Sequence, residues 1–139
     1  MVLDHVAVAA RSIEEALQFW RGLGLKVSST EEVPAQGVRV AFLELEGGGH
    51  LEILEPLGPA SPIQGFLDKR GPGLHHLAFR TVRLEEGMGA LRSRGAVLLN
   101  DLPRPGARGT RVCFVHPRSA GGVLVELVEP PPEVLDPRD

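Results

Sequence analysis

Two stretches of the chain alternate aliphatic and polar positions in the manner of half-buried strands. They are LDHVAVA, which begins at Leu3, and LHHLAFR, which begins at Leu74. Successive side chains of a strand point to opposite faces, so one of the neighbours His75 and His76 must point into the protein. A buried imidazole needs a partner. The pattern therefore predicts two strands and raises the question of what that partner is.

Each of these stretches is followed by a segment with the period of an amphipathic helix. Ser12 and Glu15 have the spacing of a capping box, and apolar residues recur behind them until Gly24 ends the predicted helix. A second helix of the same kind is predicted around residues 84–91 and ends at Gly95. Three strand-like runs then follow in each half, LKVSST, VRVAFLELE and HLEILEP in the first and AVLLN, TRVCFVH and GVLVELVE in the second.

The two halves are copies of one unit. Residues 3–27 match residues 74–98 without a gap, RVAF matches RVCF further on, and LEILEP matches VELVEP. We therefore predict an α+β fold of two tandem βαβββ modules, whose strands form one curved, cup-shaped mixed sheet around a central site. The predicted single domain spans residues 1–139, and its parts are module 1 (about 2–57), a linker helix (about 61–71) that Ser61-Pro62 begins, module 2 (about 73–130) and a tail (131–139).

The repeat places two histidines and two glutamates at matched positions. His5 matches His76, and Glu52 matches Glu126, each glutamate lying in an apolar strand and facing away from its aliphatic neighbours. A buried, unpaired carboxylate is costly, so these glutamates must face solvent or a cation. Two imidazoles and two carboxylates on one side of a sheet suit a divalent metal ion such as Co, Mn, Ni, Fe or Zn. The alternative is four polar side chains that water satisfies on an open concave face. His50 has no matched partner and is interpreted as a loop or strand-end residue.

Composition narrows the setting. The chain has 139 residues and a formal net charge of -3, which gives no general attraction to nucleic acid or to an anionic membrane. No signal peptide and no run long enough to span a bilayer is recognisable. The one cysteine, Cys113, excludes an internal disulfide. These features predict a cytoplasmic protein.

The chain resembles the vicinal oxygen chelate (glyoxalase/bleomycin resistance/dioxygenase) superfamily, and within it the methylmalonyl-CoA epimerase family. The resemblance covers about residues 2–130, through LDHVAVA, the block LEILEPLGPASPIQGFLDKRGPGLHHLAF, and HPRSAGGVLVELVEP. It implies a metal site of His5, Glu52, His76 and Glu126. It also implies an acyl-CoA substrate, a homodimer, and one divalent ion, Co²⁺ first, with Mn²⁺, Ni²⁺ or Zn²⁺ as alternatives.

The family's chemistry is the interconversion of the (2R) and (2S) epimers of methylmalonyl-CoA through an enolate. Some family members carry a non-ligand glutamate base where this chain has Val40. Glu52 and Glu126 are therefore the candidate acid/base pair as well as metal ligands, with Glu44 a weaker substitute. Basic residues that could contact the phosphates of coenzyme A are Lys69, Arg70 and Arg118.

Three other functions remain open on the sequence. A glyoxalase I-like lactoylglutathione lyase would use the same four ligands. An iron-dependent extradiol dioxygenase needs only two histidines and one carboxylate, so the fourth ligand Glu52 argues against it. A non-catalytic protein of the same fold would bind a small ligand, but such proteins often lack the metal residues that this chain retains.

Overall fold

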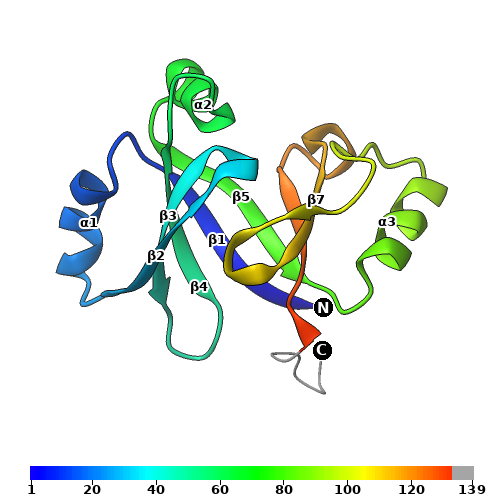
Figure 1. Cartoon of the computed structure of the whole chain (residues 1–139), viewed down its shortest axis with the longest axis horizontal. Coiled ribbons are helices and arrows are strands. Elements are labelled where there is room, and N and C mark those ends of the chain that lie inside the picture. The colour runs from blue at the N-terminus through cyan, green and yellow to red at the C-terminus, as the bar shows by residue number, and fades with distance from the viewer. Residues whose placement is uncertain (133–139) are drawn as a thin grey trace. The chain divides into compact units, whose positions relative to one another are not determined.

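The computed structural model describes residues 1–132, and their contacts divide the chain into two compact units (Figure 1). The first unit is His5–His75, and the second is Met1–Asp4 together with the described residues from His76 onward. The predicted tail lies, from residue 133, outside the described residues. None of the helices in residues 1–132 is long and apolar enough to cross a membrane.

The order of elements confirms the tandem βαβββ modules. The first module comprises β1 (Val2–Ala9), α1 (Ile13–Gly22), β2 (Val27–Val33), β3 (Val38–Glu44) and β4 (His50–Pro56), with the 3₁₀ turn η1 (Pro34–Gln36) before β3. Helix α2 (Pro62–Arg70) follows, and Ser61 caps it. The second module comprises β5 (Gly73–Arg80), α3 (Leu84–Ser93), β6 (Arg104–Pro105), β7 (Arg111–Val115) and β8 (Val125–Glu129), with turns η2 (Ala107–Gly109) and η3 (Pro117–Ser119) on either side of β7.

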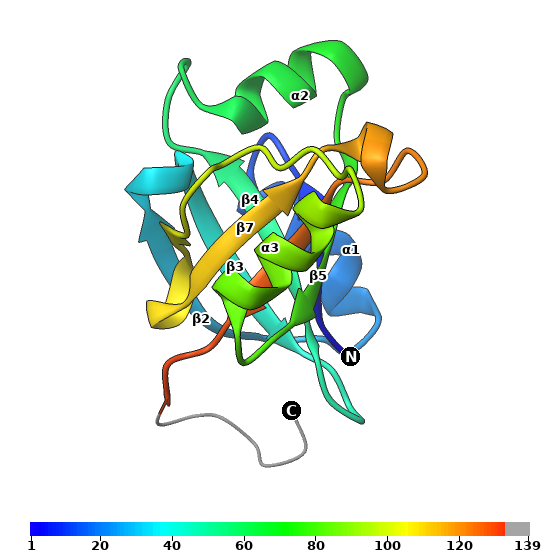
Figure 2. The same cartoon turned by 90° about the vertical axis from the view of Figure 1, so that its right-hand side faces the viewer.

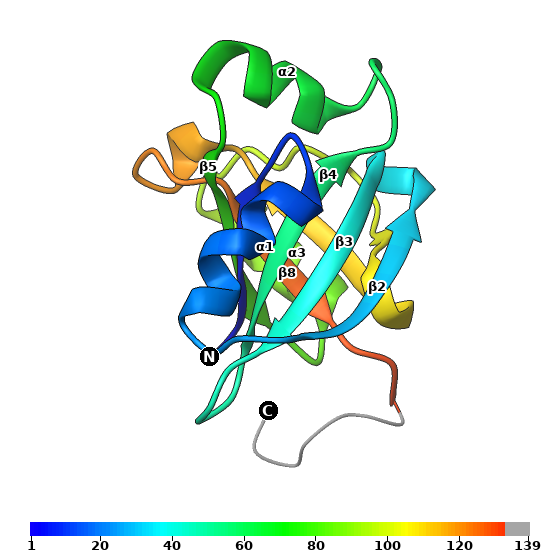
Figure 3. The ribbon, with the colours of Figure 1, turned by 90° about the vertical axis from the view of Figure 1, so that its left-hand side faces the viewer.

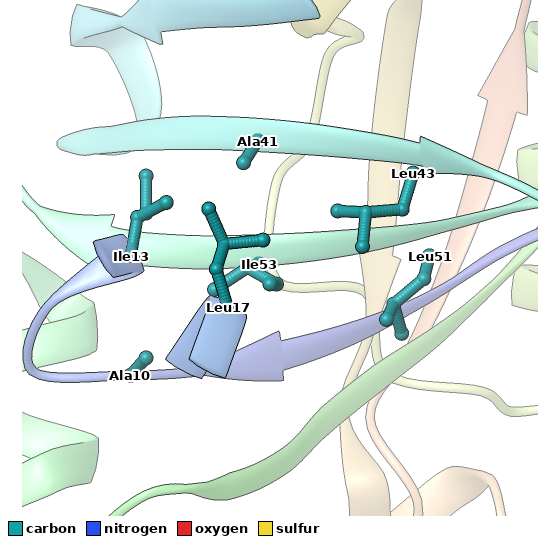
Figure 4. Close-up of a cluster of buried hydrophobic side chains, with 7 residues drawn as sticks. All are labelled: Ala10, Ile13, Leu17, Ala41, Leu43, Leu51 and Ile53. Carbon is teal, nitrogen blue, oxygen red and sulfur yellow. The ribbon is translucent and has the colours of Figure 1, made fainter. Parts of the chain in front are cut away.

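The sheet of the first module has its apolar core on the face that α1 covers (Figure 3). Its strands lie in the order β2-β3-β4-β1, with β1 parallel to β4 and the other neighbours antiparallel. Ile13 and Leu17 of α1 point at the sheet (Figure 4), and the buried cluster consists of Ala10, Ile13, Leu17, Ala41, Leu43, Leu51 and Ile53. Because side chains alternate, Phe42 and Glu52 lie on the opposite face.

The second module repeats this separation of faces (Figure 2). Its strands lie in the order β5-β8-β7-β6. Leu84 and Met88 of α3 pack on Cys113 and Leu127, and burial raises the pKa of the Cys113 thiol. The opposite face is buried by a separate cluster of Ala78, Val112 and Val128, with Phe114 beside it. Each module therefore presents one face to its helix and keeps another for other contacts.

The prediction of a strand at AVLLN was wrong. Residues 96–100 form only one isolated bridge, between Leu98 and Val115. The buried Asn100 side chain makes hydrogen bonds to the backbone of β7 in place of a strand. Its amide donates to Val112 O (3.2 Å), and its carbonyl accepts from Phe114 N (3.0 Å). Proline cannot donate a ladder hydrogen bond, and Pro103 and Pro105 leave β6 only two residues long.

A glutamate from the last strand of each module caps the helix of that module. Glu55 accepts a hydrogen bond from the backbone N–H of Ile13 (2.9 Å), the first residue of α1. Glu129 accepts one from the N–H of Leu84 (2.9 Å), the first residue of α3. The N-cap position of α3 supplies no side-chain hydrogen bond, so Glu129 fills that role. A carboxylate there satisfies an orphan donor and faces the positive end of the helix dipole.

An arginine holds each of these capping carboxylates. Arg39 donates to Glu55 (3.2 Å), and Arg111, at the matched position, donates to Glu129 (2.6 Å). Arg111 also donates to Glu85 of α3 (2.7 Å), and this hydrogen bond lowers the pKa of Glu85 to about 2. The duplicated arginine–glutamate–helix contact fixes where each helix begins on its sheet.

Replacing Glu129 with alanine should therefore destabilise the protein. We expect a loss of about 1 kcal/mol, and up to about 2, in the free energy of unfolding, as for the loss of a helix cap. Urea denaturation followed by circular dichroism measures it. Glu86→Ala is the matched control, because Glu86 is exposed in the same helix and pairs only at the surface with Arg83, where a change within about 0.5 kcal/mol is expected. Equal losses in the two variants would contradict the capping role.

Candidate metal and proton-transfer site

The register between β1 and β4 brings three chemically active side chains onto one face. His5 lies beside His50, and Ala7 lies beside Glu52, in the parallel pairing of these strands. His5, His50 and Glu52 are therefore all on the face opposite α1. His5 is 4% exposed and Glu52 is 7% exposed. The first module thus buries a carboxylate among imidazoles.

One oxygen of Glu52 is approached by both imidazoles. Glu52 Oε2 lies 2.8 Å from His50 Nε2 and 3.2 Å from His5 Nδ1. The two rings are stacked, with centroids 5.0 Å apart and planes 27° apart. The ring of Phe42, which pairs with Glu52 across the β3–β4 ladder, lies 5.5 Å from that of His50. These contacts fix the Glu52 carboxylate from two sides.

The second module builds a matching pair. His76 Nε2 lies 3.2 Å from Glu126 Oε1, and the two residues are 5% and 3% exposed. Glu126 pairs with Ala78 on β5 and with Phe114 on β7, as Glu52 pairs with Ala7 and Phe42 in the first module. The Phe114 ring meets the His76 ring edge-on at 5.3 Å. The duplication therefore preserves an imidazole–carboxylate pair together with its surroundings.

His75 and His76 point to opposite faces of the strand, as the alternation of side chains predicts. His76 is buried beside Glu126, whereas the neighbouring His75 is only half-buried. The ring of His75 lies 5.0 Å from that of Phe66 in α2, at an interplanar angle of 74°. His75 therefore packs on α2, and His76 is the one of the two that belongs to the candidate site.

The chemistry of these residues fits a divalent metal ion. In the first module, ligand atoms of His5, His50 and Glu52 lie within 4.8 Å of one another. Imidazole nitrogens and carboxylate oxygens together suit first-row divalent ions. A cation would also compensate the burial of two carboxylates, which is unfavourable when they are unpaired.

The interpretation of His50 as a strand-end residue was right about its place in the chain, but it did not include a contact with the candidate site. His50 is the first residue of β4, but it is buried and bonded to Glu52. The sequence held a signal for this. His50 and Glu52 are two residues apart in one strand, so they share a face. The repeat did not reveal this shared face, because His50 has no matching histidine in the second module.

Val40 and Glu44 lie on the same sheet face as Glu52, but neither belongs to the buried polar residues of that face. Val40 is buried on the face of Glu52, where it pairs with Leu54 and cannot move a proton. Glu44 is exposed at the end of β3 and accepts a hydrogen bond from Ser28.

Known proteins of one superfamily are similar to this chain over most of its length. Residues 4–114 match the model of the glyoxalase/bleomycin resistance protein/dioxygenase superfamily. The chain is 42% identical to the mitochondrial methylmalonyl-CoA epimerase of Mus musculus over 127 residues, which is 90% of this chain and 71% of that protein. The chain belongs to the methylmalonyl-CoA epimerase family of this superfamily.

Two further proteins are similar to this chain over most of its length. The protein YqjC of Bacillus subtilis, itself uncharacterized, is 44% identical over 129 residues, or 92% of this chain and 91% of that protein. A structure of the Streptomyces coelicolor methylmalonyl-CoA epimerase in complex with 2-nitronate-propionyl-CoA is 36% identical. It covers 94% of this chain and 97% of its own, with a TM-score of 0.86.

Replacing either of the two neighbouring histidines with alanine tests which of them binds the metal, because each variant is a control for the other. His76→Ala removes a candidate metal ligand. It should weaken the binding of Co²⁺ by more than about tenfold, since the loss of a hydrogen-bond partner of a ligand already lowers metal affinity by about that factor. His75→Ala should change mainly the free energy of unfolding, because its ring packs on Phe66.

Titration of Co²⁺ into both metal-free variants measures these effects. Equal affinity in the two variants, or a loss only in His75→Ala, would mean that the metal ligand has been assigned to the wrong histidine.

Proposed function

We propose that this chain is a methylmalonyl-CoA epimerase, an isomerase that interconverts the (2R) and (2S) epimers of methylmalonyl-CoA. The observation that carries the proposal is the pair of buried histidine–glutamate contacts, His5–Glu52 and His76–Glu126, at repeated positions. The named mouse relative and the S. coelicolor complex with a coenzyme A ester support the choice of substrate.

The two pairs are proposed to hold one divalent ion together. Its ligands are His5, Glu52, His76 and Glu126, and the preferred ion is Co²⁺, with Mn²⁺, Ni²⁺ and Zn²⁺ as alternatives. When bound, such an ion would supply Lewis-acid chemistry that stabilises negative charge on the substrate oxygens. The protein supplies the ligands and the groups that move the proton.

Inversion at C2 needs two groups that act on opposite faces of the carbon. One carboxylate removes the C2 proton, which leaves a planar enolate, and a carboxylic acid on the other face returns a proton. Glu52 and Glu126 come from equivalent strands of the two modules, which makes them the proposed pair. Val40 offers no proton-transfer group on the strand beside Glu52, and Glu44 is exposed and bonded to Ser28.

The remaining features of the proposal follow from the substrate and the family. Lys69 and Arg70 are exposed in the last turn of α2, and Arg118 is exposed in η3, where they would contact the phosphates of coenzyme A. We further propose a homodimer in the cytoplasm, a compartment that suits the free buried thiol of Cys113.

Proton exchange tests the proposed reaction directly. In heavy water, each purified epimer of methylmalonyl-CoA should take up deuterium at C2 and convert to the other epimer, and a chelator should stop both processes. Nuclear magnetic resonance follows the exchange. Isomerisation of the methylglyoxal–glutathione hemithioacetal, without exchange at C2 of methylmalonyl-CoA, would instead make the protein a glyoxalase I-like lyase.

Glu52→Gln tests the assignment of the acid/base pair. We expect kcat for epimerisation to fall by about 10²- to 10⁴-fold, the usual contribution of a positioned acid or base. One epimer should still exchange its C2 proton without inverting, because Glu126 can remove and return a proton on its own face. The other epimer should exchange very slowly.

The comparison variant is Glu44→Ala, measured in the same way with Co²⁺ at saturation. It should epimerise at close to the rate of the unmodified protein. Full activity of Glu52→Gln together with loss of activity in Glu44→Ala would overturn the assignment.

A further inference from the structure

We infer that His50 is a positioning residue for Glu52, and that it makes the two carboxylates of the site unequal. The inference rests on the proposed function, because it assigns His50 a task within the same metal and proton-transfer site. It adds a residue that lies outside the four matched positions.

The contact between His50 and Glu52 is short and buried. His50 Nε2 lies 2.8 Å from Glu52 Oε2, and both side chains are at most 10% exposed. An ionised carboxylate can only accept hydrogen bonds, so the imidazole donates from Nε2 when Glu52 is ionised. A hydrogen bond to a charged group in a buried place is among the stronger ones in proteins. It restricts the rotation of the carboxylate.

The imidazole of His50 is itself held in place. It stacks on the ring of His5 at 5.0 Å and contacts the ring of Phe42 at 5.5 Å. Its backbone begins β4 directly after the turn of Gly47, Gly48 and Gly49, all three of which have positive φ (84°, 105° and 76°). Glycine adopts these angles without strain. The turn therefore lets the chain enter β4 at His50, and the two ring contacts hold the imidazole in place.

In the described part of the second module, the position matched to His50 cannot make this contact. The alignment that pairs Glu52 with Glu126 places Leu124 opposite His50, and a leucine side chain cannot donate a hydrogen bond. The two carboxylates are alike in the strand that carries them and in their histidine neighbours, His5 and His76. They differ in this donor. An epimerase tolerates such a difference, since its two proton-transfer groups face chemically different sides of the substrate.

Loss of the His50 donor should have two effects. A carboxylate that binds metal depends on its outer hydrogen-bond partners, whose loss costs about 10- to 100-fold in metal affinity or activity. A Glu52 carboxylate that can rotate would also transfer protons poorly on its own face. Glu126 and its face of the substrate should be much less affected.

Two substitutions separate the ring of His50 from its hydrogen bond. His50→Phe keeps an aromatic ring against His5 and Phe42 but has no donor, whereas His50→Gln keeps an N–H donor without the ring. Titration of Co²⁺ into the metal-free proteins should show an affinity about 10- to 100-fold lower for His50→Phe. His50→Gln should recover most of the loss. The control is His116→Asn, because His116 only caps η3 through its Nδ1 atom, and it should bind Co²⁺ unchanged.

A second measurement uses the loaded protein. With Co²⁺ at saturation, His50→Phe should exchange the C2 proton of one epimer faster than it inverts that epimer. It should be the same epimer that exchanges in Glu52→Gln. A variant that was merely less stable would slow both epimers equally. Circular dichroism verifies folding, and His50→Leu replaces His50→Phe if the larger ring prevents it.

The outcomes distinguish this inference from the proposed function. Unchanged Co²⁺ affinity and unchanged exchange in the His50→Phe variant, with weakened binding in His76→Ala, would overturn only the role of His50. Unchanged binding in both variants would overturn the metal site itself.

Discussion

The feature on which the rest of the structure depends is a carboxylate buried on the sheet face opposite the helix. Glu52 and Glu126 are each more than nine-tenths buried, and their strand neighbours Leu51, Ile53 and Leu127 belong to the apolar cores. Burial of a lone carboxylate is unfavourable by several kcal/mol. Each module therefore has to bring a compensating group to the same face, and it brings a histidine from its first strand.

Strand geometry makes this compensation possible. In the parallel pairing of β1 with β4, Glu52 lies beside Ala7, which is two residues after His5 on the same strand face. The pairing of β5 with β8 places Glu126 beside Ala78 in the same way, two residues after His76. The helix on the other face, begun by a glutamate cap at Glu55 or Glu129, fixes which face is apolar. A register slip of one residue in β1, β4, β5 or β8 would send the site residue of that strand into the helix-packed core.

Much of this could be predicted from the sequence because the repeat supplied a second copy of each signal. Alternation gave the strands and the face of His76, and the capping and glycine signals gave the ends of α1. The strand predicted at residues 96–100 does not form. An aliphatic run does not indicate that the Asn100 side chain will make the hydrogen bonds to β7 that a strand would otherwise make. The place of His50 in the site was not predicted because the prediction relied on residues that occur in both modules. His50 occurs in the first module alone. The capping role of Glu55 and Glu129 depends on which strand lies beside the helix, which only the folded chain reveals.

The proposed function takes the ligands of a single metal ion from His5, Glu52, His76 and Glu126, rather than giving each module an ion of its own. Anomalous diffraction from a crystal loaded with Co²⁺ tests it most directly. We expect one cobalt peak per chain, surrounded by His5, Glu52, His76 and Glu126, with His50 in contact with Glu52 and not with the ion. A cobalt ion held by His5, His50 and Glu52 alone, or separate ions at the two glutamates, would contradict it.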